Sequence, residues 1–407
     1  MQPIESHTLS SGLKLIHSYV DSPVSYCGFT INAGTRDEKP EEFGIAHFTE
    51  HLLFKGTSKR GYKHIINRME NVGGELNAYT TKEETFIYAV FLEEHFERAF
   101  ELLSDLVFHS QFPENEIEKE RDVILDEINS YKDNPAELIF DEFENLLFSG
   151  HEMGHNILGE INTLENIHKE DFIRFYQSCY QPQNMVFFST GKTPFKKIVK
   201  LANKYVADTV HSNFSQMKRT PPGTMSAQSK TEDKDLYQKH VIIGTLGYNM
   251  FDKNRTSLFL LNNMLGGPCL NSRLNLSLRE KSGLVYNVES NLTSYTDTGI
   301  FSIYFGCDPK YMEKCISLVN KELKLLKEKS LTTSQLEAAK KQLKGQLGVS
   351  SENRENISLG MGKSFLHRNK YDSLQEIYRK IDHVTANQLL DTANEIFEDD
   401  RIFRLIY

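Results

Sequence analysis

Apolar residues along the first half of the chain change their period several times, which predicts alternating strands and helices. Residues 24–32 alternate as a strand does, and residues 75–81 and 85–91 form two strand-like runs that predict a hairpin. A strand, a Ser-Gly turn and a second strand are expected within residues 8–16, and another strand at 184–190. The predicted helices span residues 44–54, 62–71, 94–109, 114–132, 136–147, 168–179 and 194–206.

The second half repeats this order of elements. A strand at 241–246 precedes helices at 253–265 and 270–279, and a strand pair at 285–294 and 299–306 follows. A helix at 310–329, further helices to about 397 and a strand at 401–406 complete it. We therefore predict an α+β fold with two similar, duplicated domains, each an antiparallel sheet with helices packed on one face.

The stretch between these halves lacks an apolar period. Residues 211–235 contain Pro221-Pro222-Gly223 and clustered serine, threonine, glutamine and lysine, which is typical of a linker. The predicted domains are consequently residues 1–210 and 236–407.

Composition narrows the class of protein. The chain has 407 residues, of which 39% are hydrophobic and 25% charged, with a net charge of −9. No basic patch stands out, so we do not expect nucleic acid to be the main partner. The N-terminal residues resemble no signal peptide, and no apolar run approaches the length of a membrane span. Five scattered cysteines without a C-x-x-C spacing fit reduced thiols, so we expect a cytoplasmic protein.

One apolar helix carries an unusual set of polar residues. His47 and His51 are four residues apart, so both imidazoles project from one face of the predicted helix. That spacing lets both rings reach one zinc ion at about 2.0–2.1 Å. Glu50 lies beside the same face and can hold a water molecule there. The order H-x-x-E-H is the inverted zinc-peptidase pattern; the alternative is a helix with hydrogen-bonded core histidines.

A second, literal H-E-x-x-H pattern occurs at residues 151–155. It also needs a helix to bring His151 and His155 together. Glycines at 150, 154 and 159 surround it, and each costs about 1 kcal/mol in a helix. We interpret this pattern as a coincidence in a loop.

A catalytic zinc ion usually takes three protein ligands and a water molecule. The predicted helix at 114–132 is rich in acidic residues and has a partly apolar face. Glu120 and Glu127 share one of its faces, two turns apart. Spacing alone leaves Glu127 and Asp126 open as the third ligand.

Three segments together resemble the pitrilysin (insulinase) family of zinc peptidases, which includes mitochondrial processing peptidase. They are residues 44–56, residues 73–80 and residues 120–128. The resemblance implies that Glu127 is the third ligand, that Glu120 lies next to the metal ligands, and that Glu50 is the general base. One Zn²⁺ per chain and an endopeptidase activity on extended or unfolded peptides inside a clamshell chamber are expected to follow.

The resemblance continues in the second half. Residues 278–286 resemble the segment in which the family carries an arginine and a tyrosine, here Arg279 and Tyr286, that contact substrate near the zinc ion. Asn77 and Ala78 lie on a strand to which a peptide could add as an extra edge strand. Short members of the family resemble half of the long ones, so we expect a homodimer in which Arg279 and Tyr286 act in trans.

Two other functions remain as alternatives. The first is a non-catalytic scaffold or binding subunit of the same fold that acts with a partner chain, and it predicts a degraded metal site. The second is a zinc hydrolase that acts on another class of substrate, because a fold by itself does not establish an activity.

Overall fold

The computed structural model describes residues 4–206, 218–223 and 226–407. The chain divides into two compact units, each built from three segments. Unit 1 comprises Met1–Asn129, His155–Arg219 and Asn353–Tyr371, and unit 2 comprises Ser130–Gly154, Thr220–Glu352 and Asp372–Tyr407. The units interleave along the chain, whereas the predicted domains are continuous. Parts of the predicted linker, residues 211–217 and 224–225, lie outside the described residues.

Unit 1 is organised around a six-stranded sheet. In spatial order its strands are β1 (Glu5–Thr8), β2 (Lys14–Tyr19), β6 (Met185–Gly191), β3 (Val24–Ile31), β5 (Thr85–Leu92) and β4 (Glu75–Thr80). The predicted hairpin is confirmed, since β4 and β5 pair antiparallel with Thr80 opposite Thr85. The β2–β6 pair is parallel and the other pairs are antiparallel, so the predicted antiparallel sheet contains one parallel pair. More than 160 residues separate these two strands along the chain, a connection long enough for a parallel crossover.

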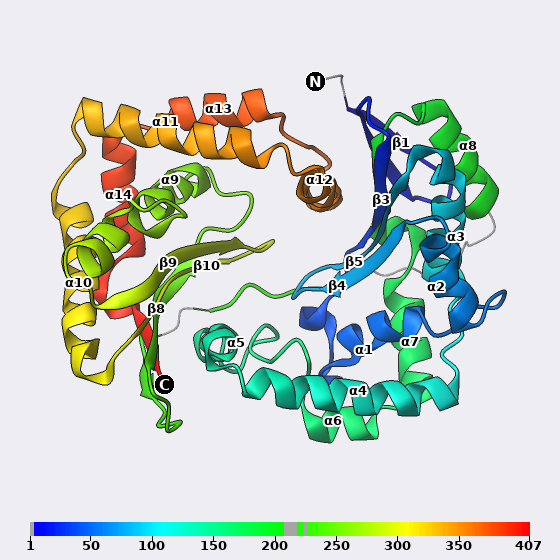
Figure 1. Cartoon of the computed structure of the whole chain (residues 1–407), viewed down its shortest axis with the longest axis horizontal. Helices are drawn as coiled ribbons and strands as arrows, with labels where there is room; N and C mark the ends of the chain where they lie inside the picture. The colour runs from blue at the N-terminus through cyan, green and yellow to red at the C-terminus, as the bar shows by residue number, and fades with distance from the viewer. Residues whose placement is uncertain (1–3, 207–217, 224–225) are drawn as a thin grey trace. The chain divides into compact units, whose positions relative to one another are not determined.

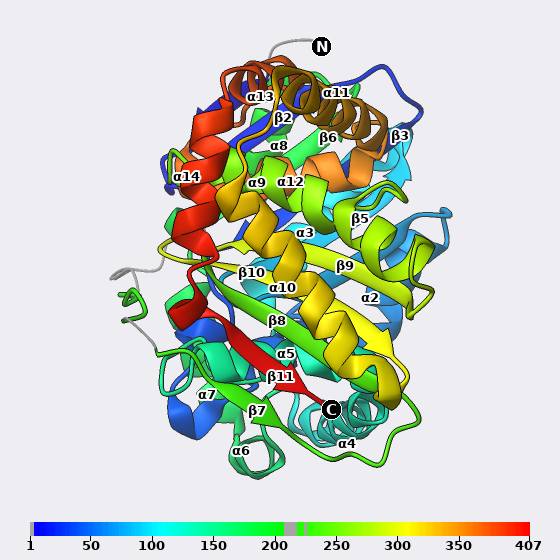
Figure 2. The same ribbon diagram turned by 90° about the vertical axis from the view of Figure 1, so that its left-hand side faces the viewer.

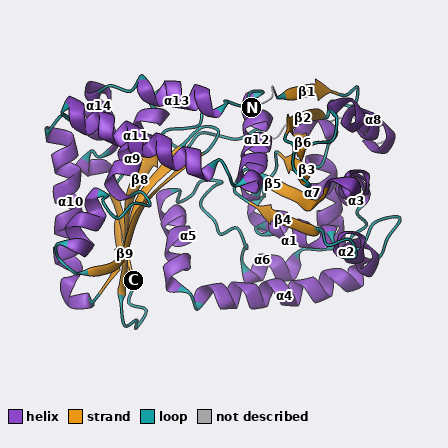
Figure 3. Ribbon diagram, turned by 45° about the horizontal axis from the view of Figure 1, so that its top comes forward, coloured by secondary structure: helices purple, strands orange, loops and turns teal. Residues whose placement is uncertain are grey.

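Helices cover both faces of this sheet. The helices of unit 1 are α1 (Ile45–Leu53), α2 (Tyr62–Glu70), α3 (Phe96–His109), α4 (Glu114–Lys132), α6 (Ile161–Asn166), α7 (Lys169–Cys179), α8 (Phe195–Val206) and α12 (Arg354–Arg368). Figure 1 and Figure 3 show α3 and α8 on one side of the strands and α12 on the other. The predicted one-sided packing describes α3 and α8 but omits α12.

Strand β6 shows why α12 belongs to unit 1. All seven of its residues are buried, and successive side chains of a strand point to opposite faces. Phe187 packs edge-on against Phe29, with ring centroids 5.2 Å apart. Its neighbour Phe188 joins a cluster with Phe86 and Met361 of α12. A strand that is apolar on both faces needs a cover on both, and α12 supplies the second.

Unit 2 is organised around a five-stranded sheet. In spatial order its strands are β7 (Ser229–Thr231), β11 (Phe403–Ile406), β8 (Lys239–Gly247), β10 (Gly299–Cys307) and β9 (Val285–Ser294). The β11–β7 pair is parallel, and the other pairs are antiparallel. Its helices are α5 (Pro135–Leu147), α9 (Arg255–Gly266), α10 (Met312–Glu328), α11 (Thr333–Ser350), α13 (Leu374–Asp382) and α14 (Ala386–Ile396). Figure 2 shows α10 lying across the strands.

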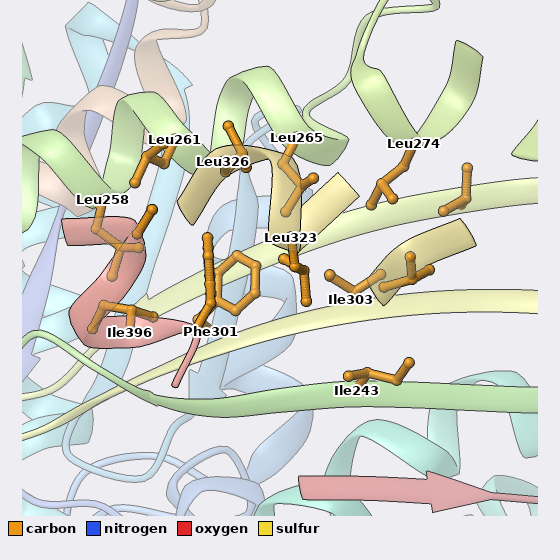
Figure 4. Packing of buried hydrophobic residues seen from close by; sticks show 14 of the residues in the cluster. Ile243, Leu258, Leu261, Leu265, Leu274, Phe301, Ile303, Leu323, Leu326 and Ile396 are labelled. Carbon is orange, nitrogen blue, oxygen red and sulfur yellow. The ribbon is translucent and has the colours of Figure 1, made fainter. Parts of the chain in front are cut away.

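The core of unit 2 has two sides. Ile243, Phe301 and Ile303 meet Leu258 of α9 and Ile396 of α14 in one cluster (Figure 4). On the other face, Ile242 of β8 packs in a second cluster with buried residues of α5. Each fully buried side chain of this kind contributes about 1.5–3 kcal/mol. The two sheets with their helices confirm the predicted α+β class.

The helix predicted at 270–279 is shorter than expected. Helical backbone begins at Arg273, and residues 275–280 form a π-helical segment that carries Arg279. The residues before it form a turn in which the Ser272 backbone N–H donates to the Cys269 carbonyl. Among the described residues, the longest helices are too short or too polar to cross a membrane.

Candidate metal centre

Helix α1 carries the H-x-x-E-H motif, and a buried carboxylate caps its beginning. The two Glu38 oxygens accept hydrogen bonds from the backbone N–H groups of Gly44 and Ala46, at 2.9 and 2.8 Å. Gly44 has a φ of +100°, and glycine adopts this left-handed conformation without steric cost. The apolar face of α1 includes Ile45, Phe48 and Leu52, none of which is exposed. Burial of this face against unit 1 fixes the orientation of the polar face.

The two motif histidines and Glu127 converge at one point. His47 and His51 have ring centroids 4.6 Å apart. Nε2 of His47 lies 3.9 Å from Glu127 Oε2, and Nε2 of His51 lies 3.8 Å from the same oxygen. Tetrahedral ligands at zinc distances are separated by about 3.4 Å, so a small contraction would bring all three onto one ion.

The geometry favours Glu127 over Asp126 as the candidate third ligand on α4. The ligand atoms of His47, His51 and Glu127 lie within 4.8 Å of one another, a group that does not include Asp126. Asp126 is exposed to solvent. One residue on a helix rotates the side chain by about 100°, so only one of two neighbours can face α1.

The chemistry of these donors fits zinc. Burial, together with the nearby His51, lowers the pKa of His47 to about 3. The ring of His47 is therefore neutral at physiological pH and has a lone pair available for a metal, which is the ligand form of histidine. A neutral imidazole pair with one carboxylate is a known catalytic zinc ligand set.

Glu120 contacts His51 at Nδ1, the ring nitrogen that does not approach Glu127. Its Oε1 lies 3.2 Å from His51 Nδ1, and its Oε2 lies 2.5 Å from the Lys55 ammonium nitrogen. A carboxylate at Nδ1 fixes the ring orientation and leaves Nε2 free to face Glu127. His47 differs, because its Nδ1 is buried and has no hydrogen-bond partner in the described part of the chain.

Glu50 lies beside the three converging residues with only 7% of its surface exposed. The Thr80 hydroxyl at the end of β4 donates a hydrogen bond to Glu50 Oε2 at 2.7 Å. Burial raises the pKa of Glu50, and Glu127 also raises it, while the Thr80 hydrogen bond and His51 lower it. A carboxylate with a raised pKa is well matched to accept a proton near neutral pH.

Asn77 and Ala78 lie on the outermost strand of the unit 1 sheet. They pair with Tyr88 and Ile87 of β5 on one side only. In the described sheet no strand pairs with the other edge of β4, so its backbone groups there are available for an added strand.

The remaining two predicted residues lie in unit 2. Arg279 stands on the π-helical segment and Tyr286 near the start of β9, with the guanidinium carbon 5.7 Å from the centroid of the tyrosine ring. Tyr286 is 85% exposed. The two side chains therefore form a solvent-facing pair, in unit 2 rather than in the unit that carries the histidines.

The rival H-E-x-x-H pattern does not form a helix. Residues 151–155 adopt turns. Nε2 of His151 lies 2.7 Å from the Thr220 carbonyl oxygen, and Nε2 of His155 lies 3.0 Å from Glu38 Oε2. His155 is thus the buried partner of the carboxylate that caps α1, which agrees with the interpretation as a coincidence in a loop.

Sequence reasoning missed Thr80, Lys55 and Glu38 as parts of this centre. Each acts through a contact between segments, such as Thr80 with a residue 30 positions earlier. The segment 73–80 did end at Thr80, but no spacing rule connects a strand end to a helix face.

Two family models match the chain. One, described as insulinase (peptidase family M16), matches residues 15–160, and the other, described as peptidase M16 inactive domain, matches residues 166–343. A protein of Bacillus subtilis described as the uncharacterized zinc protease YmxG is 31% identical over 99% of this chain and 98% of its own length. An uncharacterized zinc protease of Rickettsia bellii is 34% identical over 89% of this chain and 87% of its own length.

Solved structures resemble the fold. A protease from Helicobacter pylori superposes with a TM-score of 0.92 at 22% identity and covers all of this chain and 99% of that one. A peptidase M16 inactive domain from Pseudomonas fluorescens gives 0.91 at 20% identity and covers 99% of this chain and 97% of that one. At this identity the resemblance concerns the fold alone.

Proposed function

The chain belongs to the insulinase family, peptidase family M16, and we propose from this premise that it is a zinc-dependent endopeptidase. The observation that carries the proposal is the convergence of His47, His51 and Glu127 beside the buried Glu50. The alternative, a non-catalytic subunit, predicts a degraded metal site, whereas His47, His51, Glu127 and Glu50 are all present. The names of the relatives support zinc, with one ion per chain as our proposal.

Different residues of this chain would carry out different parts of peptide hydrolysis. A bound zinc ion supplies Lewis acidity, which makes a water molecule acidic enough to lose a proton near neutral pH. Glu50 takes that proton as general base and returns it to the leaving amine. Glu120 keeps the His51 ring in its orientation while charge develops.

We propose that the substrate binds in an extended conformation along β4. The open edge of β4 offers main-chain hydrogen bonds next to Asn77 and Ala78, a mode that requires no particular side chains. Thr80, at the end of the same strand, contacts Glu50. A peptide on this edge therefore runs toward the base, and an unfolded or extended peptide is the substrate class that fits.

We further propose a homodimer in which Arg279 and Tyr286 of a second copy complete the centre. Support comes from the resemblance of residues 278–286 to the family's substrate-contacting segment and from the exposure of Tyr286. The phenol of Tyr286 would donate a hydrogen bond to the developing oxyanion. The five free cysteines fit the cytoplasmic location that we propose.

The decisive experiment compares the wild-type protein with Glu50→Gln in zinc content and in cleavage of an unstructured fluorogenic peptide. We expect about one zinc ion per chain in both proteins, with cleavage by the wild type alone. Removal of zinc with a chelator should abolish cleavage, and added zinc should restore it. Glu94→Gln is the matched control, because the Glu94 side chain is 75% exposed.

Two other results would contradict the proposal. A wild-type protein without zinc favours the scaffold subunit. Equal cleavage by the wild type and Glu50→Gln removes Glu50 from the role of base.

A further inference from the structure

The contact between Thr80 and Glu50 points to a role that the metal ligands do not explain. Thr80 Oγ1 donates to Glu50 Oε2 at 2.7 Å. Within the described residues this is the one hydrogen bond that the Glu50 carboxylate receives. We infer that Thr80 is a positioning residue for the general base: its hydroxyl occupies Oε2 and leaves Oε1 to accept the proton of the attacking water. The inference rests on the proposed function.

The chemistry of the pair fixes the direction of this hydrogen bond. An ionised carboxylate can only accept, so the hydroxyl must donate. Only 7% of the surface of Glu50 is exposed to solvent. A buried carboxylate with one fixed oxygen has lost most of its rotational freedom before substrate arrives, which is the preorganisation that proton transfer requires.

The Thr80 hydroxyl is itself held in place. Threonine is branched at Cβ, which restricts its χ1 angle, and Thr80 is paired with Thr85 in the β4–β5 ladder. The turn that follows is closed by Thr81, whose N–H donates to the Glu84 carbonyl at 2.8 Å. The hydroxyl that touches Glu50 thus belongs to a short, hydrogen-bonded hairpin end.

The Glu84 side chain anchors this turn to α12. Its carboxylate lies 2.9 Å from the Lys363 ammonium nitrogen and 2.6 Å from His367 Nε2. Glu84 is completely buried. Although Glu83, Glu84 and His367 form a cluster of potential metal ligands, Lys363 already supplies Glu84 with a positive charge. These contacts hold the β4–β5 hairpin against α12, and the charge of Glu84 is balanced without a metal cation.

The test replaces the hydroxyl while keeping the shape of the side chain. Thr80→Val removes the donor, Thr80→Ser retains it, and Thr8→Val makes the same change at an exposed strand position in unit 1. We expect Thr80→Val to lower kcat by about 10- to 100-fold, the scale of a small misplacement of a catalytic group. KM and zinc content should stay within about twofold of the wild type, since the backbone of β4 and the ligands are unchanged. Thr80→Ser should recover most of kcat, and Thr8→Val should behave as the wild type.

Three results would overturn the inference. The first is a Thr80→Val kcat within twofold of the wild type. The second is a Thr80→Ser kcat as low as that of Thr80→Val, which would show that the hydroxyl is not the cause. The third is a rise in KM at constant kcat, which would assign Thr80 to peptide binding.

A measurement that does not depend on activity separates this inference from the proposed function. The melting temperatures of Thr80→Val, Glu50→Ala and the double variant form a cycle, because each single change removes one partner of the hydrogen bond. Non-additive shifts support the contact even in a protein that cleaves nothing. Additive shifts contradict it even when the wild type is an active peptidase.

Discussion

At the scale of single residues, we expect the charged contacts at Nδ1 of His51 to influence how tightly the proposed centre binds a metal. Lys55, Glu120 and His51 form a chain in which the carboxylate bridges an ammonium group and an imidazole. Glu120 has 9% of its side chain exposed, so it depends on these partners for the hydrogen bonds that water would otherwise supply. The metal affinity of the chain should therefore respond to residues that do not touch the metal.

We expect Glu120→Gln to weaken zinc binding by about 10- to 100-fold, the usual effect of losing a group that orients a metal ligand. The glutamine amide keeps the shape of the side chain but loses the charge. Competition with a chromophoric chelator measures the affinity directly. Glu118→Gln is the matched control on the same helix, because the Glu118 side chain is 72% exposed. Equal zinc affinities of the two variants would contradict the role of Glu120.

Glu84 gives a prediction about pH. Burial alone would raise the pKa of Glu84, but the Lys363 ammonium and His367 outweigh it and lower the pKa well below its usual range. A carboxyl group with a lowered folded-state pKa stabilises the fold fully above its unfolded pKa of about 4.3 and loses this contribution as the pH falls toward the folded value.

Glu84→Gln should accordingly lower the free energy of unfolding by about 1.5–3 kcal/mol at pH 7, the usual contribution of hydrogen bonds to a charged group. The difference from the wild type should shrink as the pH falls below about 4. Urea unfolding at pH 7 and at pH 3.5 measures both values. A difference that does not change with pH would show that the charge of Glu84 is not responsible.

The sequence predicts local relationships at this scale and leaves long-range ones open. His47, Glu50 and His51 could be placed on one face because helical spacing is regular. The choice between Asp126 and Glu127 needed either the family resemblance or the fold, because it depends on the rotation of α4 relative to α1. Thr80 was beyond reach, since the packing of α1 against the end of β4 determines which residue meets Glu50, and no local pattern shows that packing.

At the scale of secondary structure, α12 is the element whose place the sequence did not reveal. Its residues carry an ordinary helical pattern, and the neighbouring helices α11 and α13 belong to unit 2. Helix α12 belongs to unit 1 because it covers the buried face of β6 and β3 that lies opposite α3 and α8. No local sequence pattern connects that face with residues 353–371. The helix approaches the sheet closely at Gly362, where an added Cβ would lie 2.5 Å from Thr30 Oγ1 and 2.7 Å from a ring atom of Phe188.

We therefore expect Gly362→Val to destabilise unit 1 by about 1–3 kcal/mol, the usual range for overpacking a core. Gly360→Ala, on the same helix with no heavy atom within 4 Å of the added Cβ, should instead stabilise by up to about 1 kcal/mol. Thermal unfolding of the two variants separates the effect of packing from the effect of helix propensity. A Gly362→Val protein as stable as the wild type would contradict the close packing of α12.

At the scale of the whole molecule, the proposed homodimer makes a prediction about mixed dimers. Glu50→Gln damages the zinc half of a site, and Tyr286→Phe damages the half that a second copy would supply. In a mixed dimer of these variants one site would have both halves intact, so we expect about half of wild-type activity. Co-expression with two affinity tags isolates the mixed dimer for peptide-cleavage measurements.

The control for this experiment places both changes in the same half. A mixed dimer of Glu50→Gln and Glu127→Ala has no intact zinc half, and it should be inactive. If the mixed dimer of Glu50→Gln and Tyr286→Phe is equally inactive, Tyr286 does not act in trans.

The position of α12 along the chain also determines when its contacts can form during synthesis. The proposed metal ligands, the proposed base and the edge strand β4 all lie before residue 130, whereas Lys363 and His367, which contact Glu84 of the β4–β5 turn, lie in the segment 353–371. Contacts between such distant segments form late, because a long loop must close first. During synthesis the proposed zinc ligands and the proposed base would therefore emerge more than 200 residues before the helix that holds the β4–β5 turn, and the proposed centre would be complete only after α12 has been translated.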